Sequence, residues 1–375
     1  MRYYIIAGEA SGDLHGSNLV RELRLLDGQA DIRCWGGDLM EAAGGTLVKH
    51  YRDLAFMGFA EVLRNLPAIL RNIRFCKEDI LSWKPDVLVL IDYPGFNLRI
   101  AEWAKKQGIR TAFYISPQVW AWKESRVKKM KTCIDKMICI LPFEKAYYKD
   151  RWNWDVEYAG HPLVEVIDKA KAQQEIPASL QRLPANKPVI ALLPGSRRQE
   201  ISVKLPIMLS VAPLFPECSF VVAQAPGLEA SFYKPFLEGM SNVATVHNQT
   251  YALLNIARAA LVTSGTATLE TALFDVPEVV CYKGNPISYQ IAKRLIKIKF
   301  ISLVNLIMDK PVVTELIQGD LTTENLHREL SSLLYNTKRT QALQQDYQAL
   351  KQLLSRGGAA SANAARMVWE VAKGS

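Results

Sequence analysis

The sequence predicts an α/β protein with two doubly wound, Rossmann-like domains that face each other across a cleft, followed by a helical C-terminal tail. Its 375 residues are too many for one ordinary hydrophobic core and enough for two. Short apolar runs alternate with helix-like patterns, and the alternation begins again after a polar, proline-containing stretch. Strands connected through helices are mainly parallel, so we expect two parallel sheets.

The first half contains apolar runs with the length and composition of strands. They cover residues 3–7, 31–35, 86–91, 111–115 and 136–140. The run at 86–91 is the clearest, because a nearly continuous apolar run is typical of a strand buried on both faces. Helical patterns lie between the runs, at about residues 13–26, 61–83, 99–107 and from residue 142 onward. We therefore expect a first domain over residues 1–165.

A polar segment with Pro177 and Pro184, residues 166–187, is predicted to be a linker. The strand pattern then returns at residues 189–193, 219–223, 243–246, 260–262 and 278–281, and it predicts a second domain over residues 188–345. From Thr322 to Lys373 the pattern is almost purely helical, and residues 346–375 form the predicted tail.

Composition indicates a chain without a secretory or membrane-spanning segment. Six cysteines are scattered without a Cys-x-x-Cys pair, and Met1-Arg2 leads directly into a strand. No apolar run reaches the roughly 20 residues that span a bilayer. We therefore expect a cytoplasmic protein with reduced thiols, whose contact with a membrane is peripheral.

The net charge of +9 suits nucleic acid, an anionic membrane or phosphorylated substrates, so charge alone does not choose among them. No nucleic-acid recognition motif accompanies it, and we expect no nucleic-acid partner. The absence of G-x-G-x-x-G and of any Gly-Lys pair disfavours a dinucleotide-dependent dehydrogenase and a Walker loop. The chain also lacks H-E-x-x-H, zinc-ligand spacings and Asp-x-Asp, so we expect neither a cofactor nor a metal.

Two turns favour the binding of an anion. The apolar run at 189–193 stops at Pro194-Gly195-Ser196-Arg197, and a helix-like pattern follows. Glycine lets a ligand approach the backbone, the first N–H groups of a helix favour an anion, and arginine matches phosphate oxygens. A second turn of this kind is Ser264-Gly265-Thr266-Ala267. One such turn alone could equally be a solvated surface loop; the pair favours phosphate.

Carboxylates follow two of the predicted strands of the first domain. Asp92 comes directly after the run at 86–91, where it can accept a proton if partial burial raises its pKa. Alternatively it caps the turn signalled by Pro94-Gly95. Glu9 and Asp13 follow the first strand and could also be helix-cap residues. We keep Glu9 as the second candidate for catalysis.

Short blocks carry a family resemblance between about residues 3 and 306. They are GEASGD (8–13), FMGFAEV (56–62), KPD (84–86), ID (91–92) with FN (96–97), SPQVWAW (116–122), LPFE (141–144), GHP (160–162), LPGSR (193–197) and SGTATLE (264–270). In this order they resemble the lipid-A-disaccharide synthase family, inverting bacterial glycosyltransferases with the two-domain GT-B arrangement. Gly95 and Gln118 differ from residues common in the family, on the acceptor side.

The resemblance implies a transfer from UDP-2,3-diacylglucosamine to 2,3-diacylglucosamine 1-phosphate, which gives the β-1,6-linked lipid A disaccharide 1-phosphate and UDP. The absence of Asp-x-Asp predicts that this transfer is metal-independent. The resemblance also implies Asp92 as the general base and Arg197 as the group that stabilises the leaving diphosphate. Further residues are expected to bind substrate: Ser11, Gly12, Asp13, Asn97, Gly195, Ser196, Ser264, Gly265, Thr266, Ala267, Glu270 and Asn305. The resemblance assigns Glu270 to the ribose; by sequence alone it is equally an ordinary solvated helix residue, and Asn305 a polar loop residue. The nearest alternative is another GT-B transferase or epimerase of cell-envelope synthesis that acts on a UDP-sugar.

Two basic amphipathic stretches are candidates for membrane contact. Residues 62–74 place apolar side chains opposite Arg64, Arg71 and Arg74, and residues 289–300 carry four further cations among apolar residues. Such a helix can lie in an anionic interface, or it can pack its apolar face on the core. Because the implied substrates are lipids, we expect one stretch to contact the inner face of the inner membrane. A homodimer is compatible with the sequence.

Overall fold

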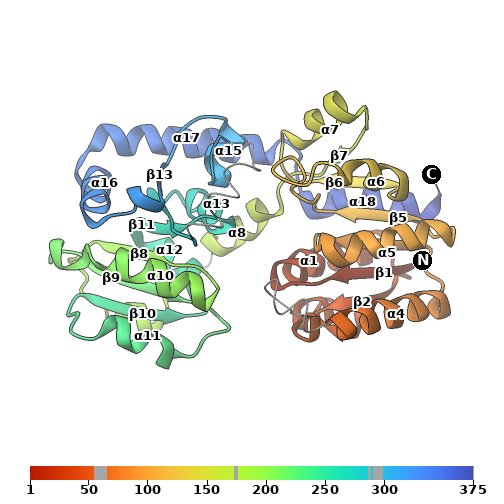
Figure 1. The fold of residues 1–375 in the computed structure, drawn as a ribbon, viewed down its shortest axis with the longest axis horizontal. Coiled ribbons are helices and arrows are strands. Elements are labelled where there is room, and N and C mark those ends of the chain that lie inside the picture. Colours follow the sequence, from red (N-terminus) through yellow and green to blue (C-terminus); the bar gives the residue numbers. More distant parts are fainter. Residues whose placement is uncertain (55–65, 173–175, 286–288, 290–298, 375) are drawn as a thin grey trace. The chain divides into compact units, whose positions relative to one another are not determined.

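A computed structural model describes residues 1–54, 66–172, 176–285, 289 and 299–374. The chain divides into two compact units (Figure 1). The first comprises Met1–Pro162 with Leu354–Ser375, and the second comprises Leu163–Leu353. Each unit is built around one parallel sheet, which confirms the predicted α/β class.

The sheet of the first unit has seven strands in the order β3-β2-β1-β4-β5-β6-β7, all parallel to their neighbours. The order reverses between β1 and β4, and such switch points are where doubly wound sheets bind ligands. The strands are β1 Arg2–Ala7, β2 Asp31–Gly36, β3 Thr46–His50, β4 Val87–Ile91, β5 Thr111–Tyr114, β6 Lys136–Cys139 and β7 Glu157–Tyr158.

Helices cover both faces of this sheet because alternate strand residues point to opposite sides. Tyr4 and Ile6 join a core cluster with α4, α5, α6 and α7, whereas Tyr3 and Ile5 join a cluster with α1 and α18. The last helix of the chain thus completes the core of the first unit. The helices are α1 Ala10–Leu26, α2 Asp38–Ala42, η1 Tyr51–Leu54, α4 Leu66–Trp83, α5 Pro94–Lys106, α6 Arg126–Cys133, α7 Glu144–Trp152 and α18 Ala360–Lys373.

The second unit has a six-stranded parallel sheet in the order β10-β9-β8-β11-β12-β13, with its switch point between β8 and β11. Its strands are β8 Val189–Leu193, β9 Ser219–Gln224, β10 Val243–His247, β11 Ala257–Thr263, β12 Glu278–Tyr282 and β13 Thr314–Ile317. Its helices are α8 Pro162–Ala172, α9 Ala178–Gln181, α10 Arg198–Leu209, η2 Ala212–Leu214, α11 Ala230–Leu237, α12 Thr250–Ile256, α13 Thr266–Leu273, α15 Leu303–Met308, η3 Gln318–Asp320, α16 Thr323–Tyr335 and α17 Thr337–Ser355.

Three short strands were not predicted: β3, β7 and β13 lie at sheet edges and are only partly buried, so their sequences lack a continuous apolar run. The stretch predicted as a linker contains α8 and α9, because buried Leu163, Ile167 and Leu180 give it an apolar side that its overall polarity hides. The predicted tail, residues 346–375, is divided between the units: most of it, with α18, belongs to the first, whereas residues 346–353 of α17 belong to the second. Among the described residues, no helix combines the length and the hydropathy needed to cross a membrane.

Candidate active site

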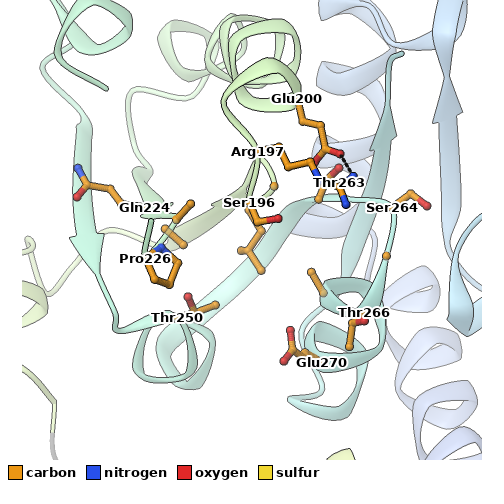
Figure 2. A pocket seen from close by; sticks show the side chains of 16 residues that line it. Ser196, Arg197, Glu200, Gln224, Pro226, Thr250, Thr263, Ser264, Thr266 and Glu270 are labelled. Carbon is orange, nitrogen blue, oxygen red and sulfur yellow. Dashed lines mark hydrogen bonds and ion pairs between the residues drawn. The ribbon is translucent and has the colours of Figure 1, made fainter. Parts of the chain in front are cut away.

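A pocket of about 450 Å³ lies in the second unit, at the carboxyl ends of β8 and β11 (Figure 2). Its size is in the range of small-molecule sites. Both predicted phosphate turns line it, as do residues that the sequence did not single out. The lining residues are Leu193, Gly195, Ser196, Arg197, Glu200, Ala223, Gln224, Ala225, Pro226, Thr250, Thr263, Ser264, Gly265, Thr266, Ala267 and Glu270.

Both turns require glycine. Gly195 has φ +119° and Gly265 has φ +138°, values that residues with a side chain rarely adopt. A Cβ on Gly195 would also lie 2.9 Å from Oε2 of Glu200. The helices that follow, α10 and α13, begin at Arg198 and Thr266 and direct their first N–H groups toward the turns. Two glycine turns, each followed by the start of a helix, therefore lie in one pocket.

Arg197 is exposed at the entrance to α10, and its Nη1 donates to Oε1 of Glu200 at 3.1 Å (Figure 2). Lys204, one turn beyond Glu200, is almost completely buried and was not identified from the sequence. Its Nζ donates to Oγ1 of Thr263, at the end of β11, and lies 3.9 Å from Oε2 of Glu200. Burial lowers the pKa of Lys204, and the charge of Glu200 partly offsets this effect. The sequence did carry one signal for Lys204: its spacing places it on the same helix face as residues 197 and 200.

Glu270 lines the pocket from α13. Its Oε1 accepts a hydrogen bond from the hydroxyl of Tyr251 at 2.7 Å, which orients the carboxyl group. Burial raises the pKa of Glu270, and the bond from Tyr251 opposes that shift. A further wall consists of Gln224 at the end of β9, Ala225 and Pro226, together with Thr250 at the start of α12. Sequence reasoning missed this wall; its one signal was the Ala-Pro-Gly turn after a strand.

Two predicted donor-side residues use their side chains inside the fold. The hydroxyl of Ser264 donates to the carbonyl of Ile301 at 2.9 Å. Asn305 is buried; its amide nitrogen donates to the carbonyl of Val313, and its amide oxygen accepts from the N–H of the same residue. Asn305 thus shapes the loop after α15, while the backbone of Ser264 lines the pocket.

In the first unit, Asp92 directly follows β4 and lies in a strained turn. Asp92 and Tyr93 have φ of +43° and +48°, and consecutive left-handed residues with side chains cost free energy that tends to be retained at functional sites. Burial, followed by the negative charge of Glu9, raises the pKa of Asp92 to about 6. The carboxylate can therefore hold or release a proton near neutral pH, as a general base requires.

The other predicted residues of the first unit surround this turn. Asn97 is buried, and its amide donates to the carbonyls of Ile91 at 3.2 Å and Asp92 at 2.8 Å, so it holds the turn in place. Glu9 and Ser11 are exposed at the start of α1, and Gly12 packs close to the end of β1.

The side chain of Asp13 is hydrogen-bonded within the fold. It is buried, and its carboxylate accepts hydrogen bonds from the backbone N–H groups of Gly37, Leu39 and Met40 at 2.8 to 3.2 Å. Asp13 therefore caps the start of α2. The sequence allowed a cap role, but Asp13 itself lies inside α1 and caps a different helix.

Glu144 is a buried carboxyl group to which the sequence assigned no role. It accepts hydrogen bonds from the indole N–H of Trp120 at 3.1 Å and the backbone N–H of Leu141 at 3.0 Å. Burial raises its pKa to about 8, with a smaller contribution from Asp92. The conspicuous LPFE block contains it, but a block does not reveal which of its side chains is buried.

Comparisons with known proteins identify the family of this chain. The family described as lipid-A-disaccharide synthetase matches residues 3–368. Lipid-A-disaccharide synthase from Trichlorobacter lovleyi is 37% identical over 96% of this chain and 94% of its own length. The enzyme of that name from Coxiella burnetii is 38% identical over 97% and 96%.

Solved structures share the fold at low sequence identity. UDP-GlcNAc 2-epimerase from Neisseria meningitidis, bound to UDP-GlcNAc, covers 100% of both chains with a TM-score of 0.68 and 14% identity. The glycotransferase of kitacinnamycin has a TM-score of 0.63 and 15% identity over 99% of this chain and 98% of its own. These likenesses show the GT-B fold, and the sequence relatives show the family. The chain belongs to the lipid-A-disaccharide synthase family.

Proposed function

We propose that Asp92 and the pocket of the second unit perform the reaction of this family on UDP-2,3-diacylglucosamine and 2,3-diacylglucosamine 1-phosphate. One observation carries the proposal: two glycine turns and Arg197 line a single pocket at a sheet switch point, and the buried Lys204 donates to Thr263 of its lining. Backbone N–H groups and fixed cations of this kind stabilise the charge that develops on a departing diphosphate.

Within the pocket, we assign each part of the UDP moiety to a different wall. We assign the diphosphate to the two turns and Arg197, and the ribose hydroxyls to Glu270, whose carboxyl group Tyr251 orients. The uracil is assigned to the wall of Gln224, Ala225 and Pro226. The backbone there follows a β9 that is buried throughout, so it forms a rigid edge.

Asp92 supplies the base. Its carboxylate takes the proton of the acceptor's 6-hydroxyl as that oxygen forms a bond to the anomeric carbon of the donor. The bond from this carbon to the diphosphate breaks, and its electron pair leaves with UDP. Attack opposite to the leaving group inverts the anomeric centre and gives the β linkage.

Purified protein incubated with the diacylated donor and acceptor tests the proposal, with mass spectrometry of the lipid product and measurement of released UDP. We expect disaccharide 1-phosphate and UDP in equal amounts. UDP-GlcNAc without acyl chains is the control donor. Transfer from that donor at the same rate, or epimerisation of it without transfer, would contradict the assignment.

Lipid substrates require access to a membrane, and α4 offers a surface for it. Leu70 and Leu81 are 53% and 46% exposed, beside the exposed cations Arg71 and Arg74. Ile73 instead packs on the core, so the apolar side of this helix serves both roles. Residues 62–65 of the first stretch and 290–298 of the second lie outside the described residues. We propose peripheral contact through α4 with the inner face of the inner membrane.

Replacing Leu70 by Ser and Arg71 and Arg74 by Gln should reduce binding to anionic liposomes, because both apolar area and charge attraction are lost. Flotation at increasing salt measures it, and binding of the parent should fall as salt screens the charges. Arg328→Gln with Lys338→Gln removes the same number of exposed charges from α16 and α17 as a control. Equal binding of the parent to neutral and anionic vesicles would contradict the electrostatic part.

A further inference from the structure

The carboxylate of Glu200 lies beside the glycine turn at residues 194–197. Glu200 is in the first turn of α10, and its side chain points back toward Arg197 (Figure 2). Oε1 accepts from Arg197 at 3.1 Å, while Oε2 lies 3.9 Å from Nζ of Lys204. The same oxygen would lie 2.9 Å from a Cβ on Gly195, so the carboxylate is close to the backbone of the turn. A negative group thus occupies the part of the pocket that is best suited to a phosphate.

Lys204 is buried behind the lining of this pocket. Its hydrogen-bond acceptor Thr263 and its ionic partner Glu200 both line the pocket. An ammonium group carries three N–H donors, and Thr263 takes one of them. The distance of 3.9 Å to Glu200 is an ionic contact and too long for a hydrogen bond. Donors of Lys204 are therefore left for a stronger anion.

We propose that Lys204 is a second cation of the diphosphate subsite, and that Glu200 is a resident anion that competes with the donor's diphosphate for Lys204 and Arg197. The proposal rests on the donor pocket assigned above and adds which of its groups the nucleotide must displace. Lys204 is fixed, since its side chain is 4% exposed, whereas that of Glu200 is 36% exposed and can turn toward solvent. Glu200 holds both cations near the turn, and a diphosphate with more charge replaces it.

Glu200→Gln tests the proposal, because glutamine keeps the shape of the side chain and an acceptor for Arg197 but removes the negative charge. We expect UDP to bind about three- to tenfold more tightly, since juxtaposed like charges oppose binding. Calorimetric titration with UDP measures the Kd, and the difference should shrink at high salt. Glu238→Gln makes the same charge change at the exposed end of α11, outside the pocket lining, and should keep the parental Kd.

If Glu200 serves only to hold Arg197 in place, removing its charge should not tighten the binding of UDP. Glu200→Gln that binds UDP with the parental Kd, or more weakly, would overturn the proposal while leaving the donor pocket intact. Failure of the parent to bind UDP would remove the donor pocket itself, and this inference with it.

Lys204→Met gives an independent test of the second cation. Methionine retains most of the buried volume without the charge, and we expect UDP to bind at least about tenfold more weakly. The melting temperature is measured on the same sample to establish that the variant is folded. A folded Lys204→Met protein with the parental Kd would exclude Lys204 from the subsite; if it does not fold, Glu200→Gln decides.

Discussion

Asp92→Asn is expected to lower turnover by about 10²–10⁴-fold, the usual contribution of a positioned proton acceptor. Asparagine keeps the size and shape of the side chain in the strained turn but cannot accept the proton of the acceptor hydroxyl. The Kd for UDP should stay close to that of the parent, because the donor pocket lies wholly within the second unit. Turnover near the parental rate would move the role of base to Glu9.

The stability of the Asp92→Asn variant distinguishes a general base at this position from a residue that caps the turn. Burial raises the pKa of Asp92 from 3.8 to about 6, so the folded protein binds the proton more tightly than the unfolded chain does. The contribution of the Asp92 carboxyl group to the free energy of unfolding is fully present below its pKa in the unfolded chain, and it is lost as pH rises through its pKa in the folded protein. Asp92→Asn should therefore be more stable than the parent above about pH 7, by on the order of 1–3 kcal/mol. A capping aspartate predicts the reverse, a loss of about 1 kcal/mol with activity retained.

Arg197→Ala is expected to cost about 2–4 kcal/mol in kcat/KM, because it removes a charge-assisted contact to the diphosphate as negative charge develops there. UDP affinity should fall in parallel. Arg198→Ala is the matched control: the guanidinium of Arg198 lies over the ring of Phe232, 4.4 Å from its centre, and Arg198 is not among the pocket-lining residues. Arg197→Ala with UDP affinity and turnover within about twofold of the parent would place the diphosphate elsewhere.

Local sequence patterns predicted most of the buried strands and both glycine turns. Buried parallel strands such as β4 and β8 appear as continuous apolar runs, and the glycine turns after β8 and β11 carry their own conformational requirement. Position after a strand was enough to single out Asp92, because strand ends in a parallel sheet share one edge.

Residues whose burial or role depends on tertiary contacts were harder to predict from the sequence. Lys204 and Glu144 have polar side chains in helices, and such residues are mostly exposed, so burial could not be predicted. Asn97 and Asn305 were predicted to bind substrate, and the structure shows that the amide nitrogens of both donate to backbone carbonyls within the fold. An amide that supports a turn and one that faces a ligand look identical in sequence. The place of α18 in the first unit depends on its pairing with α1, which is distant along the chain.

The pH dependence of kcat/KM, compared between the parent and Asp92→Asn, tests the central claim most directly. The parent's rate should rise with pH along a limb with an apparent pKa near 6, since Asp92 must be ionised to accept the proton. In Asp92→Asn that limb should vanish, and the residual rate should be flat over the same range. A limb that persists unchanged in the variant would contradict the account, because another group would then be the base.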